Sequence, residues 1–278
     1  MTADTDLDLV AMAYAEDLGN PGDITTNAIV PAEARTNAIV VARSPGCVAG
    51  VDAAMACFRH IDPSLALFAA VEDGTVVDTG ATLIEVSGST RSILTAERVA
   101  LNLLGHLSGI ATATRACVDA VAGSGARISD TRKTTPGLRG LEKRAVVSGG
   151  GVNHRFGLFD QVLIKDNHLA AAPSIAAPVA SARASVGPDV RIEVEVDTID
   201  QLRRVLDTDA DAVLLDNMTV EDLTAAVALV GGRIETEASG GVTLDTVAAI
   251  AATGVDVISI GWLTHSAPAL DVAMDVVG

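Results

Sequence analysis

The pattern of apolar and polar positions divides the chain into two parts of different character. In the first part, short apolar runs separated by turn residues predict strands over 37–43, 67–71, 75–78 and 82–86. A capped helical segment within 1–30 and a helix over 51–60 accompany these strands. A run of helix formers over 92–122 then spaces its apolar residues three and four positions apart. The first part therefore predicts a small mixed sheet with helices, and the domain boundary falls in this run.

Two glycines interrupt the 92–122 run. Gly105 and Gly109 indicate either a close approach of another segment or a break in the helix. The sequence leaves these two interpretations open.

From residue 127 onward, strand and helix patterns alternate. The strand candidates are 127–130, 161–164, 191–196, 212–215, 233–237 and 255–260. The helical stretches between them are 138–148, 174–186, 199–206, 220–230 and 244–252. Such alternation implies parallel strands joined by right-handed crossovers. Six strand–helix units favour a complete or partial barrel over a short open sheet, and no GxGxxG motif follows the first strand, which disfavours dinucleotide binding.

Polar residues recur at the predicted strand ends. In a parallel barrel the loops that follow the strands share one face, and that face carries the active site. The polar positions in or after the six strands are Arg132, Lys133, Lys165, Asp166, Asn167, Glu193, Glu195, Asp216, Asn217, Ser239, Gly240, Gly241 and Gly261. If the strand phasing is correct, these groups converge on one cavity.

Charge is distributed unevenly along the chain. The whole chain carries a formal charge of −17, which disfavours nonspecific nucleic-acid binding. Residues 132–165 nevertheless contain seven lysines and arginines against two acidic residues, and all three lysines of the chain lie there. A solvated basic face is the plain interpretation of such a run. Like charges this close repel one another, however, and we therefore favour a ligand with several phosphates or carboxylates.

Two further features fit an anionic ligand. The segment Ser239–Gly241 follows a strand and precedes a helix, as expected either for a phosphate-binding loop or for a tight turn. Glu195 and Asp216 each end an apolar strand. They indicate a Mg²⁺ site, carboxylates that stabilise developing positive charge, or structural pairing with arginine.

Composition gives an expectation about location. The amino-terminal residues lack the basic start and apolar stretch of a signal peptide, and no apolar run approaches the ~20 residues of a membrane span. The three widely spaced cysteines suggest reduced, buried thiols. We therefore expect a cytoplasmic protein. The acidic, lysine-poor composition suits a halophilic source, with an ordinary acidic protein from a GC-rich genome as the alternative.

Taken together, the motifs resemble the quinolinate phosphoribosyltransferase family, also called carboxylating nicotinate-nucleotide pyrophosphorylases. The resemblance covers nearly the whole chain. It rests on segments 16–19, 22–26, 95–98, 101–102, 130–134, 149–155, 163–168, 193–196, 214–217, 237–241 and 263–266. Any one of these segments alone is weak, but their order along the chain makes the resemblance specific. Arg144 departs from the pattern, because many relatives have an aromatic residue there.

The resemblance implies a two-domain α/β protein. It places an N-terminal α/β sandwich over 1–107, with 264–278 packing back on it, and an open α/β barrel over 108–263. It implies a homodimer with shared active sites, with a hexamer as a further option. The implied reaction joins quinolinate to phosphoribosyl pyrophosphate with Mg²⁺ and yields nicotinate mononucleotide, pyrophosphate and CO₂, a step of NAD biosynthesis.

The resemblance also implies roles for individual residues. Those that would bind quinolinate are Arg132, His154, Arg155, Lys165 and, from the neighbouring subunit, Arg98. Those that would bind phosphoribosyl pyrophosphate are Lys133, Arg139, Lys143, Ser239, Gly240, Gly241 and Gly261. The implied catalytic residues are Lys133, Glu195 and Asp216, and the last two would also hold the metal.

Other functions remain open from the sequence. One is a related phosphoribosyltransferase of another aromatic acid, of the type found in molybdenum operons. A second is a Schiff-base aldolase that uses Lys133 or Lys165 as nucleophile. A noncatalytic anion-binding module would explain the basic cluster, but it would leave Glu195 and Asp216 at the strand ends unexplained.

Overall fold

The chain forms two compact units in a computed structural model that describes residues 3–170, 172 and 174–277. The first unit comprises Met1–Arg115, Thr134–Gly150 and Thr264–Gly278, and the second comprises Ala116–Lys133 and Gly151–Leu263. This division differs from the expected ranges 1–107 and 108–263, chiefly because residues 134–150 belong to the first unit. There, the apolar side chains of 141, 145 and 146 share a core with those of 107, 110 and 111.

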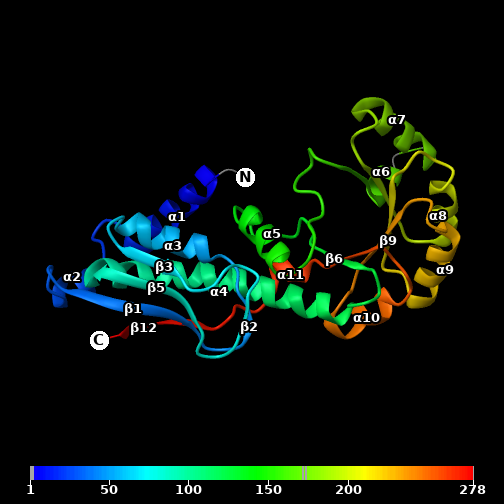
Figure 1. Ribbon diagram of the computed structural model, residues 1–278. Coiled ribbons are helices and arrows are strands. Elements are labelled where there is room, and N and C mark those ends of the chain that lie inside the picture. Colours follow the sequence, from blue (N-terminus) through cyan, green and yellow to red (C-terminus); the bar gives the residue numbers. More distant parts are fainter. Residues whose placement is uncertain (1–2, 171, 173, 278) are drawn as a thin grey trace. The chain divides into compact units, whose positions relative to one another are not determined.

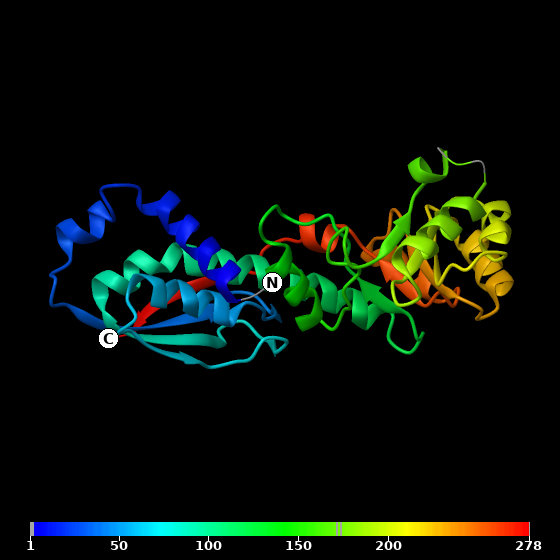
Figure 2. The ribbon, with the colours of Figure 1, turned by 90° about the horizontal axis from the view of Figure 1, so that it is seen from above.

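The first unit is built on a four-stranded antiparallel sheet. Its strand order is β12 (Val272–Val277), β1 (Arg35–Ala42), β5 (Thr82–Ser89) and β3 (Ala66–Ala69). Side chains alternate between the two faces of a strand, so Ala38 and Val40 are buried while Asn37 is exposed. Helices α3 (Val51–Ile61) and α4 (Thr90–Ala120) contribute their apolar residues to the same core (Figures 1 and 2).

The first unit also contains helices and short strands outside the four-stranded sheet. They are α1 (Ala3–Leu18), α2 (Ile24–Ile29), β2 (Gly46–Cys47), β4 (Val76–Val77), α5 (Arg139–Ser148) and α11 (Trp262–His265), the last of which spans the boundary between the units. None of the described helices is both long enough and apolar enough to cross a membrane.

Gly105 and Gly109 allow a close approach and do not break helix α4. A Cβ atom at Gly109 would lie 2.2 Å from the carbonyl oxygen of Pro268, and one at Gly105 would lie 2.9 Å from that of Leu270. The backbone N–H of Leu270 also donates to the carbonyl of Gly105. The C-terminal segment therefore runs against the helix before β12 pairs with β1.

The second unit contains a six-stranded, all-parallel sheet among the described residues. Its order is β6 (Arg127–Ser129), β11 (Val257–Ser259), β10 (Glu235–Ser239), β9 (Ala212–Asp216), β8 (Ile192–Val196) and β7 (Val162–Ile164). Helices α6 (Asp166–Ala170), α7 (Ala176–Val186), α8 (Ile199–Val205), α9 (Val220–Val230) and α10 (Leu244–Ala251) follow the strands. No pairing joins β6 to β7 in the described part, so the barrel is open, as expected.

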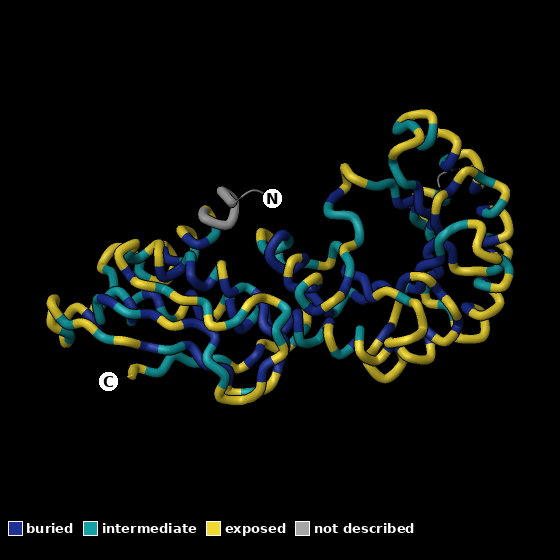
Figure 3. Tube along the Cα trace, in the orientation of Figure 1, coloured by how far each residue is buried: buried dark blue, intermediate teal, exposed yellow. Residues whose placement is uncertain are grey.

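The strand register puts polar side chains on one face of this sheet. Glu195 on β8 pairs with Leu214 on β9, which in turn pairs with Glu237 on β10. Residues in register, and those two positions along, point to the same side. Glu193, Glu195 and Glu237 therefore share the inner face, while the intervening apolar residues of β8 pack outward. Figure 3 shows that these strands are largely buried.

Strand β10 begins later than the sequence predicts. It covers Glu235–Ser239 rather than 233–237, because Gly231 and Gly232 adopt positive φ and form the turn after α9. Ser239 is thus the last residue of the strand and pairs with Asp216. The short elements α2, α6, α11 and β2 and the terminal strand β12 were not predicted as elements.

Candidate active site

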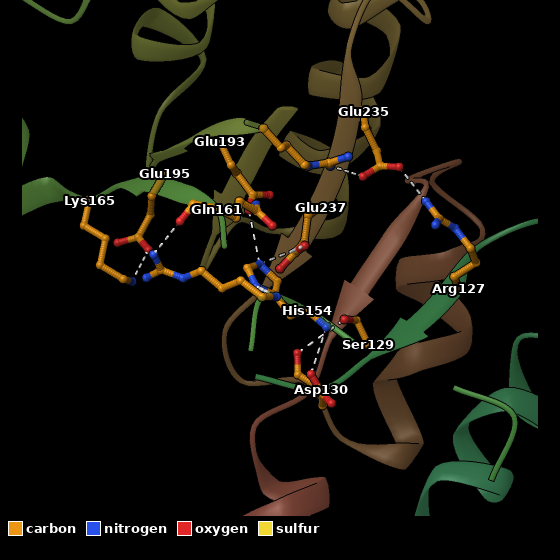
Figure 4. A network of polar contacts seen from close by, with 12 residues as sticks. Arg127, Ser129, Asp130, His154, Gln161, Lys165, Glu193, Glu195, Glu235 and Glu237 are labelled. Atoms are coloured by element: carbon orange, nitrogen blue, oxygen red, sulfur yellow. Dashed lines mark hydrogen bonds and ion pairs between the residues drawn. The ribbon is translucent and has the colours of Figure 1, made fainter. Parts of the chain in front are cut away.

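Lys165 and Glu195 meet at the carboxyl ends of neighbouring strands. Lys165 follows β7 and Glu195 lies on β8, and the Lys165 Nζ atom is 2.5 Å from Glu195 Oε2. The Glu195 side chain is only 11% exposed, whereas that of Lys165 is 44% exposed. The ammonium thus pairs with a largely buried carboxylate, as Figure 4 shows, while its own side chain stays partly exposed to a ligand.

Arg155 lies in an electrostatically unfavourable place for a cation. Burial lowers the pKa of its guanidinium, and the positive charge of Arg132 lowers it further. Asp160 and Glu193 act in the opposite direction. Arg155 and Arg132 therefore lie close enough to repel one another, and an anionic ligand between them would relieve that repulsion.

His154 connects the open edge of the sheet to its interior. Val152 forms a parallel bridge with Ser129 of β6, and the backbone N–H of His154 donates to Asp130 Oδ1 at 2.9 Å. The imidazole Nε2 lies 3.1 Å from Glu193 Oε2 and 3.5 Å from Glu237 Oε2. All three side chains are almost completely buried, and Figure 4 shows them pointing toward one another.

This cluster perturbs the protonation of Glu237. Burial raises the pKa of its carboxyl to about 7, and the neighbouring negative charge of Glu193 adds to the increase. His154, Ser259 and Arg191 act in the opposite direction. His154, Glu193 and Glu237 also bring potential metal-ligand atoms within 4.8 Å of one another. A proton or another cation nearby would therefore stabilise the buried carboxyl pair of Glu193 and Glu237.

The ends of β9 and β10 form a compact loop pair. Asn217 has a φ of 53°, and its backbone N–H donates to the carbonyl of Ser239 at 2.8 Å. Its side-chain amide donates to Asp216 Oδ2 at 2.6 Å. Gly240, with a φ of 97°, lies against Asn217 so closely that a Cβ would come within 2.1 Å of the Asn217 Oδ1. Gly241 faces open space ahead of helix α10, as a phosphate-binding loop requires.

Other predicted residues of the second unit lie at the same ends of the strands. Arg132 and Lys133 follow β6, and the Lys133 backbone N–H donates to the Thr131 side chain at 3.0 Å. Gly261 follows β11. The structure thus places Arg132, Lys133, Lys165, Asp216 and Gly261 at or just after the carboxyl ends of β6, β7, β9 and β11.

Three predicted residues belong to the first unit and are described within it. Arg98 on α4 has a side chain that is 63% exposed, with a loose contact of 3.7 Å to Glu97. Arg139 at the start of α5 donates through Nε to the Thr134 hydroxyl. Lys143 is buried, at 2% exposure, which does not favour a direct contact with pyrophosphate.

The sequence interpretation assigned no role to Glu237 or Gln161. Glu237 lies in a predicted strand, but its burial against Glu193 depends on a register across three strands. Gln161 Nε2 donates to Glu193 Oε2 at 2.9 Å. No local sequence pattern predicts this contact. The signal that was available is the alternation of Glu with apolar residues in 192–196, which indicates a polar inner face.

Cations, buried carboxylates and a glycine-rich loop at the carboxyl ends of parallel strands define an enzyme-type site for a polyanionic substrate. The chain belongs to the quinolinate phosphoribosyltransferase family. Residues 23–108 match the model of the quinolinate phosphoribosyl transferase N-terminal domain, and residues 110–275 match that of the C-terminal domain.

Individual relatives agree with this assignment. A probable carboxylating nicotinate-nucleotide pyrophosphorylase of Bacillus subtilis is 48% identical over 205 residues, covering 74% of this chain and 71% of that protein. The Mycobacterium leprae carboxylating enzyme is 49% identical over 209 residues, covering 74% and 73%. The solved nicotinate-nucleotide pyrophosphorylase of Francisella tularensis superposes with a TM-score of 0.95 at 38% identity, covering 100% and 98%.

Proposed function

We propose that this protein transfers the phosphoribosyl group of phosphoribosyl pyrophosphate to quinolinate, with release of pyrophosphate and CO₂ to give nicotinate mononucleotide. The observation that carries the proposal is the set of cations Arg132, Arg155 and Lys165 in the same unit as the glycine-rich loop after β10. Quinolinate brings two carboxylates and its cosubstrate brings phosphates, and arginine and lysine side chains bind both kinds of anion. The family match supports this substrate pair over another aromatic acid or an aldol reaction.

In this reaction the cations divide between the two substrates. Arg132, Arg155 and Lys165 bind the carboxylates of quinolinate, in the bidentate manner that suits guanidinium groups. Lys133 contacts phosphoribosyl pyrophosphate, and Ser239, Gly240, Gly241 and Gly261 hold its 5′-phosphate. Arg139 acts on the pyrophosphate. Once the pyridine nitrogen has bonded to the ribose, its positive charge stabilises the electron pair that remains on the adjacent ring carbon when the carboxylate leaves as CO₂. A proton from the solvent then bonds to that carbon.

Two carboxylates act on the ribose side. Glu195 and Asp216 share the inner face at neighbouring strand ends, where they would stabilise an oxocarbenium-like transition state. They also suit Mg²⁺, which prefers one or two carboxylates together with substrate phosphates. A bound Mg²⁺ would neutralise charge on the leaving pyrophosphate.

The proposed enzyme is a homodimer in which Arg98 of one subunit completes the quinolinate site of the other. The high exposure of the Arg98 side chain supports this role, since it leaves the guanidinium available for a neighbouring molecule. We place the enzyme in the cytoplasm, in line with its three buried free cysteines. Its charge of −17 with only three lysines supports a halophilic source.

A quinolinate-dependent assay tests the proposal. Purified protein with Mg²⁺, quinolinate and phosphoribosyl pyrophosphate should release CO₂ and form a product with the mass of nicotinate mononucleotide. Omission of either substrate should abolish both signals. Formation of the nucleotide from nicotinate, with no turnover of quinolinate, would overturn the proposed substrate. Trapping of a carbonyl substrate on Lys133 or Lys165 by borohydride would instead support an aldolase.

A further inference from the structure

Glu193 lies at the junction of two hydrogen-bonded contacts in the interior of the second unit. Its side chain is completely buried. Its Oε2 atom accepts from Gln161 Nε2 at 2.9 Å and lies 3.1 Å from His154 Nε2 (Figure 4). One oxygen of a buried carboxylate therefore engages two side chains that come from different segments of the chain.

The hydrogen-bond partners fix the orientation of the His154 ring. Its Nδ1 atom accepts from the backbone N–H of Arg155 at 2.7 Å. In the neutral ring the other nitrogen then carries the proton, so Nε2–H donates to the Glu193 carboxylate. Both ring nitrogens are thereby used within the protein.

The two contacts of Glu193 converge on Arg155. Through His154, Glu193 fixes the backbone N–H of Arg155. Through the side chain of Gln161, it fixes the residue whose carbonyl oxygen accepts from Arg155 Nη1 at 3.2 Å. The backbone and the guanidinium of Arg155 are thus held from one buried carboxylate.

We propose that Glu193 is a positioning residue that presents the Arg155 guanidinium to the substrate carboxylate. This inference rests on the proposed function, because it takes Arg155 as a quinolinate-binding residue. It also assigns His154 to the support of Arg155, in place of the direct quinolinate contact that the family resemblance implies. A planar, bidentate donor depends strongly on orientation, so the loss of this support weakens quinolinate binding more than phosphoribosyl pyrophosphate binding.

Glu193→Met tests the inference, because it keeps the side-chain length and removes both acceptor oxygens. We expect KM for quinolinate to rise at least about tenfold while KM for phosphoribosyl pyrophosphate stays within about twofold, as expected for lost support of a single ligand group. Glu193→Gln retains a carbonyl oxygen that can accept from both donors, so it should recover most of the loss. A purely structural role would affect both substrates alike.

The matched control is Glu235→Met. Glu235 lies on the same inner face, at the opposite end of its strand, and it pairs with Arg127 and Arg191. This variant should lower thermal stability without a selective change in KM for quinolinate. The same selective change in both variants would overturn the inference.

A double-mutant cycle provides the sharpest test. If Glu193 acts through Arg155, then Glu193→Met should cause no further loss of quinolinate affinity in an Arg155→Ala background. Additive losses would overturn the inference while leaving the proposed function intact. If Glu193→Met does not fold, Gln161→Ala provides a second test, because it removes one of the two contacts. It should give a smaller selective rise in KM for quinolinate. An unchanged KM for quinolinate would count against the inference. If the wild type fails to turn over quinolinate, the proposed function falls and this inference falls with it.

Discussion

The carboxyl of Glu237 lies in the protein interior beside that of Glu193, and burial raises its pKa to about 7, well above the ordinary value of 4.5. The folded state therefore binds this proton more tightly than the unfolded state does. The stabilisation is fully present below about pH 4.5 and is lost as the pH rises through 7. Glu237→Gln removes this titration while keeping the shape of the side chain.

We expect the variant to gain stability relative to the wild type as the pH rises from 5 to 8, by up to roughly 3 kcal/mol at about 1.4 kcal/mol per pKa unit. Urea unfolding of both proteins at several pH values measures the difference, because titrating groups far from position 237 contribute equally to the two proteins. Parallel stability profiles would mean that Glu237 ionises normally.

At the residue scale, sequence reasoning identified the cations but missed part of their surroundings. Local charge marks the basic segment 132–165 in an acidic chain, and the family resemblance then assigns Arg132, Arg155 and Lys165 within it to quinolinate. Glu237 carries no such mark, since 36 acidic residues occur in the chain. Its burial depends on strands β8, β9 and β10 being in register, which is a property of the folded sheet.

Among the elements, the loop after β10 offers the sharpest test of the phosphate site. Gly240 has a φ of 97°, and an added Cβ would meet Asn217 Oδ1 at 2.1 Å and Asn217 N at 2.9 Å. Gly240→Ala therefore forces Asn217 away from Ser239. We expect at least about a tenfold increase in KM for phosphoribosyl pyrophosphate, together with a stability loss of about 1–2 kcal/mol from the strained φ.

Gly232→Ala is the matched control for the loop. Gly232 also has a positive φ, of 75°, but an added Cβ meets nothing within 4 Å. This variant should show a similar backbone strain without a change in KM. Steady-state kinetics and thermal unfolding of the two variants separate the effect of the clash with Asn217 from the effect of backbone strain. Equal KM values for phosphoribosyl pyrophosphate in the two variants would contradict a phosphate-binding role for the loop.

Long helices were predicted well, whereas some of the shortest elements were missed. Helix α9 begins and ends at the predicted residues, because its apolar spacing and its glycine stop are both local signals. Strand β10 was placed two residues early, since the turn at Gly231 and Gly232 delays the pairing with β9 until Glu235. Two-residue strands and single-turn helices such as β2 and α11 depend on their neighbours and have little pattern of their own.

At the scale of the whole molecule, the sequence predicted an α/β protein with an open parallel barrel, and the fold confirms that class. The assignment of 134–150 to the first unit was not predicted. This segment follows the first barrel strand in sequence, but the apolar residues of α5 pack on α4 in that unit's core. In a regular α/β alternation, the order of elements along the chain predicts which elements pack together. It does not predict that one helix of the series packs in a different unit.

The proposed shared site predicts that two inactive variants regain activity when they form mixed dimers. Arg98→Ala and Arg155→Ala should each abolish most activity, because each removes a guanidinium from the quinolinate site. If Arg98 acts on the neighbouring subunit, a mixed dimer of the two variants contains one site with both arginines intact. Random pairing of equal amounts should then restore about 25% of wild-type activity, since half of the dimers are mixed and half of their sites are complete. The assay requires co-expressed or refolded mixtures, with each variant alone as the control. If both variants alone are inactive and the mixture stays inactive, Arg98 acts within its own chain.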